Sequence, residues 1–269
     1  MAVNIILVPI DFSEAAKIAV NYALMLAEKL DHELKFVHGY SLGQVEERPM
    51  GFDMAADEEK EARQRSEDFL SQFSKLRTVK YSNEFVWGSI VDAICETATQ
   101  YKVDLIVMVT SGASDLGSFF IGTTSEKVSK KAPCPVLIVP DGLTHFKIEK
   151  LCFALKSTYS DQKGTVSLVP KIIDLFTAEL SIVLISERDE IDETSEFLQI
   201  PNALQKLSNS FQVIDHNVPE EAISEFLTDS DSDMLILYDE EQGFFDGIFN
   251  PGLRKKLVFN SDIPLLILK

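Results

Sequence analysis

The sequence predicts an α/β protein made of two tandem doubly wound domains, each a five-stranded parallel sheet with helices on both faces. Two observations support this fold class. Short apolar runs of strand length alternate with helical patterns along the first half, and the same order of segments starts again near residue 149. Such alternation is typical of parallel strands joined by right-handed helical crossovers. We place the boundary in the polar stretch DGLTHFK at 141–147, which gives domains at 1–142 and 148–269.

The first half carries five strand signals and four helix signals. The apolar run VNIILVP at 3–9 comes first, and Ser13 then begins a pattern of apolar residues at three- and four-residue steps. The stretch VDLIVMV at 103–109 is apolar at successive positions, as strands buried on both faces are. The other expected strands lie at 34–40, 84–88 and 135–139, and the other expected helices at 54–76, 90–101 and 123–131.

The second half repeats this order with weaker motifs. KLCFALK at 150–156 resembles NIILVPID, and IPLLILK at the end of this half resembles CPVLIVP at the end of the first. An internal duplication is the simplest explanation. The expected strands are 150–156, 180–186, 211–215, 232–239 and 263–268, and the expected helices lie near 164–178, 193–208, 218–229 and 250–259.

The composition excludes several classes of partner. A formal net charge of −18 argues against nucleic acid, because a phosphate backbone is bound mainly by Lys and Arg. No apolar run reaches the roughly 18–20 residues that cross a bilayer, and no signal peptide is recognisable, so we expect a cytoplasmic protein without a membrane partner. We expect the cysteines Cys95, Cys134 and Cys152 to be buried reduced thiols, not a disulfide framework or a metal site.

The strand ends of the first half are the candidate ligand site. In open α/β sheets, ligands bind outside the carboxyl ends of strands, where the strand order reverses. Asp11 follows the first strand and could accept hydrogen bonds from a nucleoside, and Val109 ends the fourth strand. Gly122, Thr123 and Thr124 then open a helix whose free N–H groups could bind phosphate oxygens.

Each of these residues also has a structural interpretation. Asp11 can be a turn and helix-cap residue, Gly112 can serve a loop dihedral, and Thr123 or Thr124 can be a plain N-cap. The two standard nucleotide motifs, G-x-x-x-x-G-K-[ST] and G-x-G-x-x-G, are absent.

Catalysis is not indicated by the sequence. The four histidines are scattered, and no pair of residues stands out as general acid and base. His38 lies at a strand end near the candidate site, where we expect it to hydrogen-bond with the backbone.

The motifs together resemble the universal stress protein family. ILVPIDFSEAAKIAVNYALMLA, FVHGY, VDLIVM, SGASDLGSFFIGTTSEKV and APCPVLIVP follow one another in the family's order over 3–140. The resemblance extends less strictly to 149–269, as in the tandem form of the family. It implies a role in stress response or signalling and pairing through the fifth strands. Here that pairing would be an intramolecular pseudo-dimer of the two domains, with a homodimer also allowed.

The resemblance further implies an adenine-nucleotide site, with ATP as ligand, in the first domain only. Many members bind ATP through Gly, two residues, Gly, nine residues, Gly, and then Ser or Thr. This pattern aligns with Val109, Gly112, Gly122 and Thr123. The spacing is intact, but Val109 replaces the glycine where the backbone approaches the nucleotide closely. Asp115 replaces another common glycine and puts a carboxylate near the triphosphate, which should weaken binding.

The same resemblance gives each candidate residue a role. Asp11 would contact the ribose or adenine, Pro9 and Ile10 would line the base pocket, and Gly39 would lie beside the adenine. The phosphates would face Gly112, Gly122, Thr123 and Thr124.

The second half departs further from the family pattern. Lys156 stands in the place of Asp11, and the acidic run 239–241 lies where phosphates would bind, so we expect no nucleotide there. This half either only completes the pairing of the sheets or forms a different contact site through Phe244, Phe245 and Phe249.

We therefore expect a non-catalytic stress-response module with a weakened ATP site and no metal site of its own. The alternatives are a structural or partner-binding protein whose nucleotide site has decayed, and a weak ATP hydrolase. For hydrolysis, Asp115 is the nearest candidate to orient water.

Overall fold

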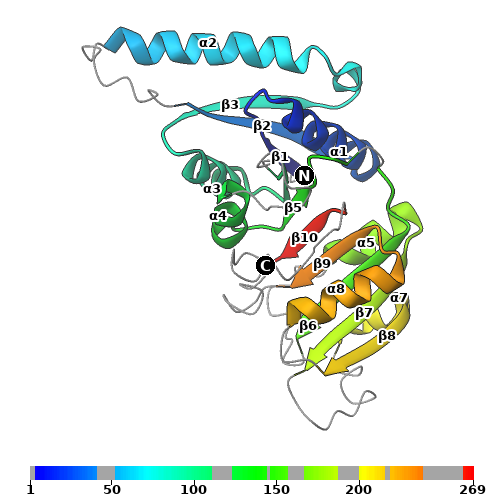
Figure 1. The fold of residues 1–269 in the computed structure, drawn as a ribbon. Helices are drawn as coiled ribbons and strands as arrows, with labels where there is room; N and C mark the ends of the chain where they lie inside the picture. Colours follow the sequence, from blue (N-terminus) through cyan, green and yellow to red (C-terminus); the bar gives the residue numbers. More distant parts are fainter. Residues whose placement is uncertain are drawn as a thin grey trace. The chain divides into compact units, whose positions relative to one another are not determined.

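The structure is a computed structural model, and it describes residues 4–40, 52–110, 123–143, 146–156, 167–186, 200–215, 219–238 and 263–269. These residues form an α/β fold of parallel strands and helices, which confirms the predicted fold class (Figure 1). They fall into two compact units. One unit contains the residues up to Val109 together with Thr123–Val136, and the other contains Thr110 and the residues from Leu137 onward.

The five strands of the first half overlap the predicted strands, although the third begins at Tyr81, three residues earlier than expected. Four of them lie in the first unit, and the fifth begins there at Val136 and continues into the other unit. The strands are β1 (Ile5–Pro9), β2 (Glu33–Tyr40), β3 (Tyr81–Trp87), β4 (Leu105–Val109) and β5 (Val136–Val139). Their order is β3-β2-β1-β4, with β1 parallel to both β2 and β4. At the start of β5, the carbonyl oxygen of Pro135 accepts a hydrogen bond from the Ile106 N–H at 3.0 Å.

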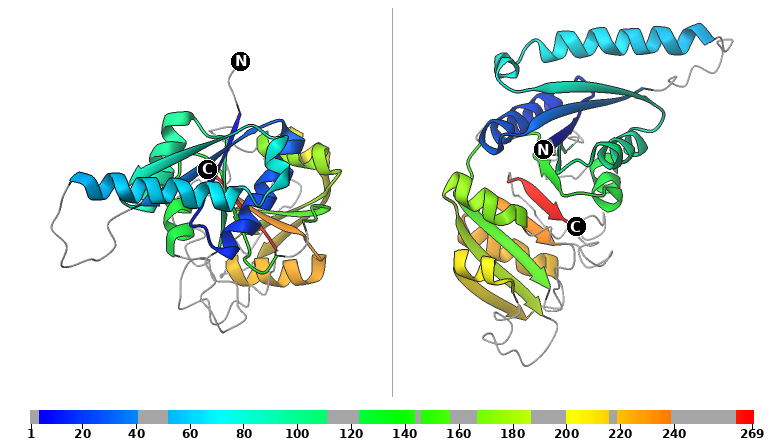
Figure 2. Two further views of the ribbon diagram at one scale, coloured as in Figure 1. Left: turned by 90° about the horizontal axis from the view of Figure 1, so that it is seen from above. Right: turned by 180° about the vertical axis from the view of Figure 1, so that it is seen from behind.

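Helices cover both faces of this sheet. They are α1 (Glu14–Leu30), α2 (Phe52–Leu70), the short 3-10 helix η1 (Ser74–Arg77), α3 (Ile90–Tyr101) and α4 (Thr123–Lys131). Helices α3 and α4 lie side by side in Figure 1, and α2 runs along β2 and β3 in both views of Figure 2. The bounds of α3 and α4 match the prediction.

The buried face and the two capped ends of α1 agree with its sequence pattern. Its inward face consists of alanine, valine and leucine side chains together with Tyr22, and Ser13 caps its first turn by accepting a hydrogen bond from the Ala16 N–H at 3.1 Å. Asp31 ends the helix in the left-handed conformation. The expected helix at 54–76 is instead split, because Ser71 and Gln72 hydrogen-bond through their side chains to the Asp68 carbonyl oxygen and help end α2.

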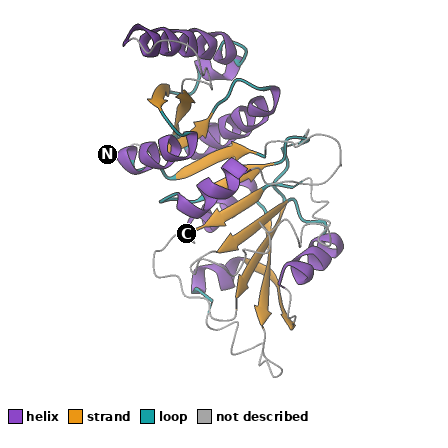
Figure 3. Cartoon of the chain, turned by 60° about the vertical axis from the view of Figure 1, so that its left-hand side comes forward, coloured by secondary structure: helices purple, strands orange, loops and turns teal. Residues whose placement is uncertain are grey.

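The second unit has the same topology. Its strands are β6 (Lys150–Lys156), β7 (Glu179–Ser186), β8 (Ser208–Asp215), β9 (Met234–Tyr238) and β10 (Leu265–Leu268), in the order β10-β9-β6-β7-β8. Its helices are α5 (Leu168–Phe176), α7 (Asn202–Leu207) and α8 (Pro219–Ser230). Every pair of neighbouring strands is parallel, as the arrows in Figure 3 show. The helix expected near 250–259 lies outside the described residues.

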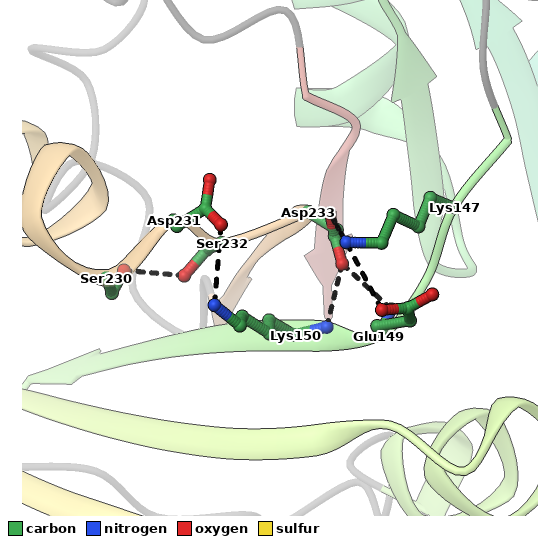
Figure 4. A network of polar contacts seen from close by, with 7 residues as sticks. All are labelled: Lys147, Glu149, Lys150, Ser230, Asp231, Ser232 and Asp233. Atoms are coloured by element: carbon green, nitrogen blue, oxygen red, sulfur yellow. Dashed lines mark hydrogen bonds and ion pairs between the residues drawn. The ribbon is translucent and has the colours of Figure 1, made fainter.

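An aspartate holds the amino ends of two strands together in each unit. Asp104, just before β4, accepts a hydrogen bond from the Ile5 N–H at 2.8 Å. Asp233, just before β9, accepts hydrogen bonds from the N–H groups of Glu149 and Lys150, each at 2.9 Å (Figure 4). The two aspartates occupy equivalent places in the two sheets, as an internal duplication would produce.

Within the described residues, no helix has both the length and the apolarity that crossing a membrane would require.

Candidate functional site

The carboxyl ends of β1, β2 and β4 meet at one edge of the first sheet. The register pairs Pro9 with Val37 and Leu7 with Ile106, so all three strands run out in the same direction. The strand order reverses at β1, because β2 lies on one side of it and β4 on the other. This is the position at which open α/β sheets bind ligands.

The predicted site residues that the structure describes all lie at this edge. They are Pro9, Ile10, Asp11, Gly39 and Val109 at the strand ends, and Thr123 and Thr124 in the first turn of α4. Gly112, Gly122 and the neighbouring Asp115 lie outside the described residues.

Asp11 has a structural role in the turn after β1. Its Oδ1 accepts hydrogen bonds from the backbone N–H and the hydroxyl of Ser13, at 3.0 and 2.6 Å. The residue is exposed, and both of these bonds use the same oxygen. The carboxylate therefore keeps acceptor capacity at Oδ2 for a ligand while it stabilises the start of α1.

Phe12, between these two residues, has an unusual backbone. Its φ is +65°, a left-handed conformation that costs a bulky residue about 1–3 kcal/mol unless its surroundings enforce it. The ring lies 4.4 Å from the ring of His38 and 5.9 Å from that of Phe69, between centroids. The guanidinium of Arg65 lies 4.9 Å from the Phe12 ring centroid. No signal in the sequence pointed to Phe12, because the side chains that contact its ring come from distant parts of the chain.

His38 makes the backbone contact that the sequence analysis predicted. Its Nδ1 lies 2.8 Å from the carbonyl oxygen of Ile10, and since a carbonyl can only accept, Nδ1 donates. Burial lowers the pKa of His38 below its usual range, against the opposing effect of the Ile10 hydrogen bond. The neutral imidazole is thus favoured beside the candidate site.

Gly39 has a packing reason to be glycine. A Cβ built at this position would lie 3.0 Å from both the Cα and the Cδ1 of Ile90, at the start of α3. This close approach needs no ligand to explain it.

Val109 is linked to α4 through its backbone. Its carbonyl oxygen accepts a hydrogen bond from the Ser125 hydroxyl at 3.2 Å, and Ser125 is buried. Thr123 is exposed and Thr124 half-buried. Ser125 was missed by sequence reasoning, although a serine in the first turn of a helix is a common source of such contacts.

The remaining chemistry of the described residues is limited. No group of three or more His, Cys, Asp or Glu side chains among them could hold a metal ion. All three cysteines are free, and burial raises the pKa of Cys134 and Cys152 to about 12. The expected burial is confirmed for these two thiols, whereas Cys95 is only half-buried. Residues 239–241 and the three phenylalanines of the second half lie outside the described residues.

The chain is similar to universal stress proteins in both sequence and fold. The universal stress protein family model matches residues 3–140. A universal stress protein of Thermus aquaticus is 34% identical over 137 residues, which cover 50% of this chain and 96% of the relative. One of Methanocaldococcus jannaschii is 29% identical over 136 residues, covering 50% of this chain and 80% of the relative.

Solved structures extend the likeness of fold to the whole chain. A universal stress protein from Archaeoglobus fulgidus matches with a TM-score of 0.72 and 19% identity, covering 100% of this chain and 99% of that one. A universal stress protein solved in complex with cAMP also matches, with 23% identity and a TM-score of 0.38, covering 52% of this chain and 98% of its own.

Proposed function

Because the chain belongs to the universal stress protein family, we propose that it is a tandem member acting in the stress response, with a weakened adenine-nucleotide site in its first domain. The observation that carries this proposal is the meeting of Asp11, Gly39 and Val109 at the reversal of strand order. ATP is the proposed ligand, and residues 1–142 and 148–269 are the proposed domains.

The site is proposed to be weak because its strand-end half has lost a glycine. Val109 brings a half-buried branched side chain to the end of β4, where the family pattern has backbone only. The helix-start half, Gly122 with Thr123 and Thr124, keeps the residues that could bind phosphate through N–H groups. Asp115 adds a repelling carboxylate.

We propose that the second domain takes the place of a partner subunit, in the cytoplasm, by pairing through the fifth strands. The sequence of each fifth strand is entirely apolar, VLIV in β5 and LLIL in β10, which is typical of strands covered on both faces. A pseudo-dimer predicts a full-chain mass of 30.1 kDa in light scattering, and a homodimer predicts twice that mass.

The nucleotide proposal is tested by mass spectrometry of small molecules released from the purified full chain. We expect an adenine nucleotide from the parent and less from an Asp11→Ala variant. Release of no nucleotide from either, together with no uptake of added ATP, would favour the second candidate function, a partner-binding protein with a decayed site. That candidate is supported by the structural roles of Asp11 and Gly39, which require no ligand.

A weak hydrolase is distinguished by phosphate release. Steady release from ATP that is lost in Asp115→Asn would support hydrolysis, and a rate equal to that of ATP in buffer would support a binding module.

A further inference from the structure

Phe12 stands apart from the other left-handed residues of the described chain. The other non-glycine residues with positive φ follow or cap the carboxyl end of a helix, where this conformation is common. They are Asp31, Lys102, Thr177 and Asp231. Phe12 instead precedes a helix, and its conformation needs a separate cause.

The side chains around the Phe12 ring come mainly from α2. The Phe12 ring is contacted by Arg65 at 4.9 Å and by Phe69 at 5.9 Å, both from this helix, and by His38 at 4.4 Å from β2. Phe69 is buried, so it fixes the face of α2 that lies against the Phe12 ring. These contacts hold the ring in place and so enforce a backbone conformation that Phe12 would otherwise leave.

The enforced conformation determines where the Asp11 carboxylate lies. Asp11 and Ser13 are joined across Phe12 by two hydrogen bonds, and Ser13 in turn caps α1. A change of φ at Phe12 would separate the carboxylate from Ser13 and would release the cap.

We propose that Phe12 and Arg65 are positioning residues through which the docking of α2 sets the geometry of Asp11 for an adenine-nucleotide ligand. The part of this inference that concerns a nucleotide rests on the proposed function. The part that links α2 to the turn at Asp11–Ser13 rests only on the contacts described above. Coupling of this kind is reciprocal, so a ligand that engages Asp11 would also hold α2 more firmly on the sheet.

Arg63 provides a matched control on the same helix. Its guanidinium lies 4.6 Å from the Phe85 ring centroid, and it also pairs with Glu59, whose carboxylate accepts a hydrogen bond from the Tyr40 hydroxyl at 3.1 Å. Arg63 therefore makes the same kind of cation–ring contact as Arg65, but with Phe85, and it is not among the residues described in contact with Phe12.

The first test needs no ligand. Hydrogen exchange at the Ser13 and Ala16 amides should accelerate about fivefold or more in Arg65→Gln, change little in Arg63→Gln, and return toward the parent rate in Arg65→Lys, which keeps the cation. The urea midpoint should stay close to the parent value, which separates positioning from general loss of structure. Equal exchange in the two glutamine variants would overturn the proposal.

The second test adds ATP to the full chain. Arg65→Gln should weaken ATP binding about fivefold or more relative to Arg63→Gln, and Arg65→Lys should bring the affinity back toward that of the parent. Equal affinity in the two glutamine variants would overturn the coupling to the ligand. If the parent binds no ATP, the proposed function fails, and the exchange experiment alone then decides the positioning role.

Discussion

Asp233 should contribute more to stability than Asp104, although the two occupy equivalent places in the two sheets. Asp233 accepts two backbone hydrogen bonds at 2.9 Å and lies 3.6 Å from the Lys147 ammonium, with its side chain 16% exposed. Asp104 accepts one backbone hydrogen bond, at 2.8 Å, and is exposed. The perturbation is Asp233→Ala, compared with Asp104→Ala.

The magnitude follows from the number of hydrogen bonds. A hydrogen bond to a charged group contributes a net ~1.5–3 kcal/mol, and the lower value suits amides that water can reach after the change. The free energy of unfolding should therefore fall by about 3 kcal/mol in Asp233→Ala and by about 1.5 kcal/mol in Asp104→Ala. Asp233→Asn keeps an acceptor oxygen and should cost about half as much as Asp233→Ala.

Urea unfolding followed by circular dichroism measures both values. Asp231→Asn is the control, because asparagine tolerates the φ of 51° at this position, the aspartate is 90% exposed, and its pair with Lys150, at 3.4 Å, is a surface ion pair worth roughly 0–1 kcal/mol. The reasoning would be refuted if Asp233→Ala cost no more than Asp104→Ala, or no more than the control.

Three further predictions concern the packing of Gly39, the pKa of His38 and the exposure of Cys95. Gly39→Ala should destabilise the first domain by about 1–3 kcal/mol, because the new Cβ meets the Ile90 backbone; an unchanged urea midpoint would contradict this packing. His38 has a pKa below 6.5 in the folded chain, so the unfolded chain binds more protons, and stability should fall as the pH falls below 6.5 toward the folded pKa. His38→Gln should flatten this pH dependence of the urea midpoint, and an unaltered slope would show that other groups cause it. Iodoacetamide at pH 8 should alkylate Cys95 before the two buried cysteines, and peptide mass spectrometry that found equal labelling in the folded chain would oppose this order.

The sequence was sufficient for most of the fold because its signals are local. The apolar periodicity of α1 and the continuous apolar runs of β1 and β4 identify their elements without tertiary information. The division after Leu70 was missed, since it depends on side chains that bond to the Asp68 carbonyl, a contact no periodicity encodes.

The candidate site could be predicted only in part, because some of its contacts join residues far apart in the sequence. Strand ends are local features, so Asp11 and Val109 could be assigned to the sheet edge from spacing. The left-handed Phe12 could not, because Arg65 and Phe69, which hold it, lie more than fifty residues away. Gly39 was assigned to a ligand, whereas the structure adds a packing reason that depends on α3.

Calorimetric titration with ATP of the parent chain and of Val109→Gly tests the proposed function most directly. Restoring glycine at the end of β4 should strengthen ATP binding by about tenfold, equivalent to about 1.4 kcal/mol, and Gly122→Val should abolish the binding that the parent shows. The expected result is a higher affinity for ATP in Val109→Gly than in the parent chain. The absence of binding in both would contradict an adenine-nucleotide site in this protein.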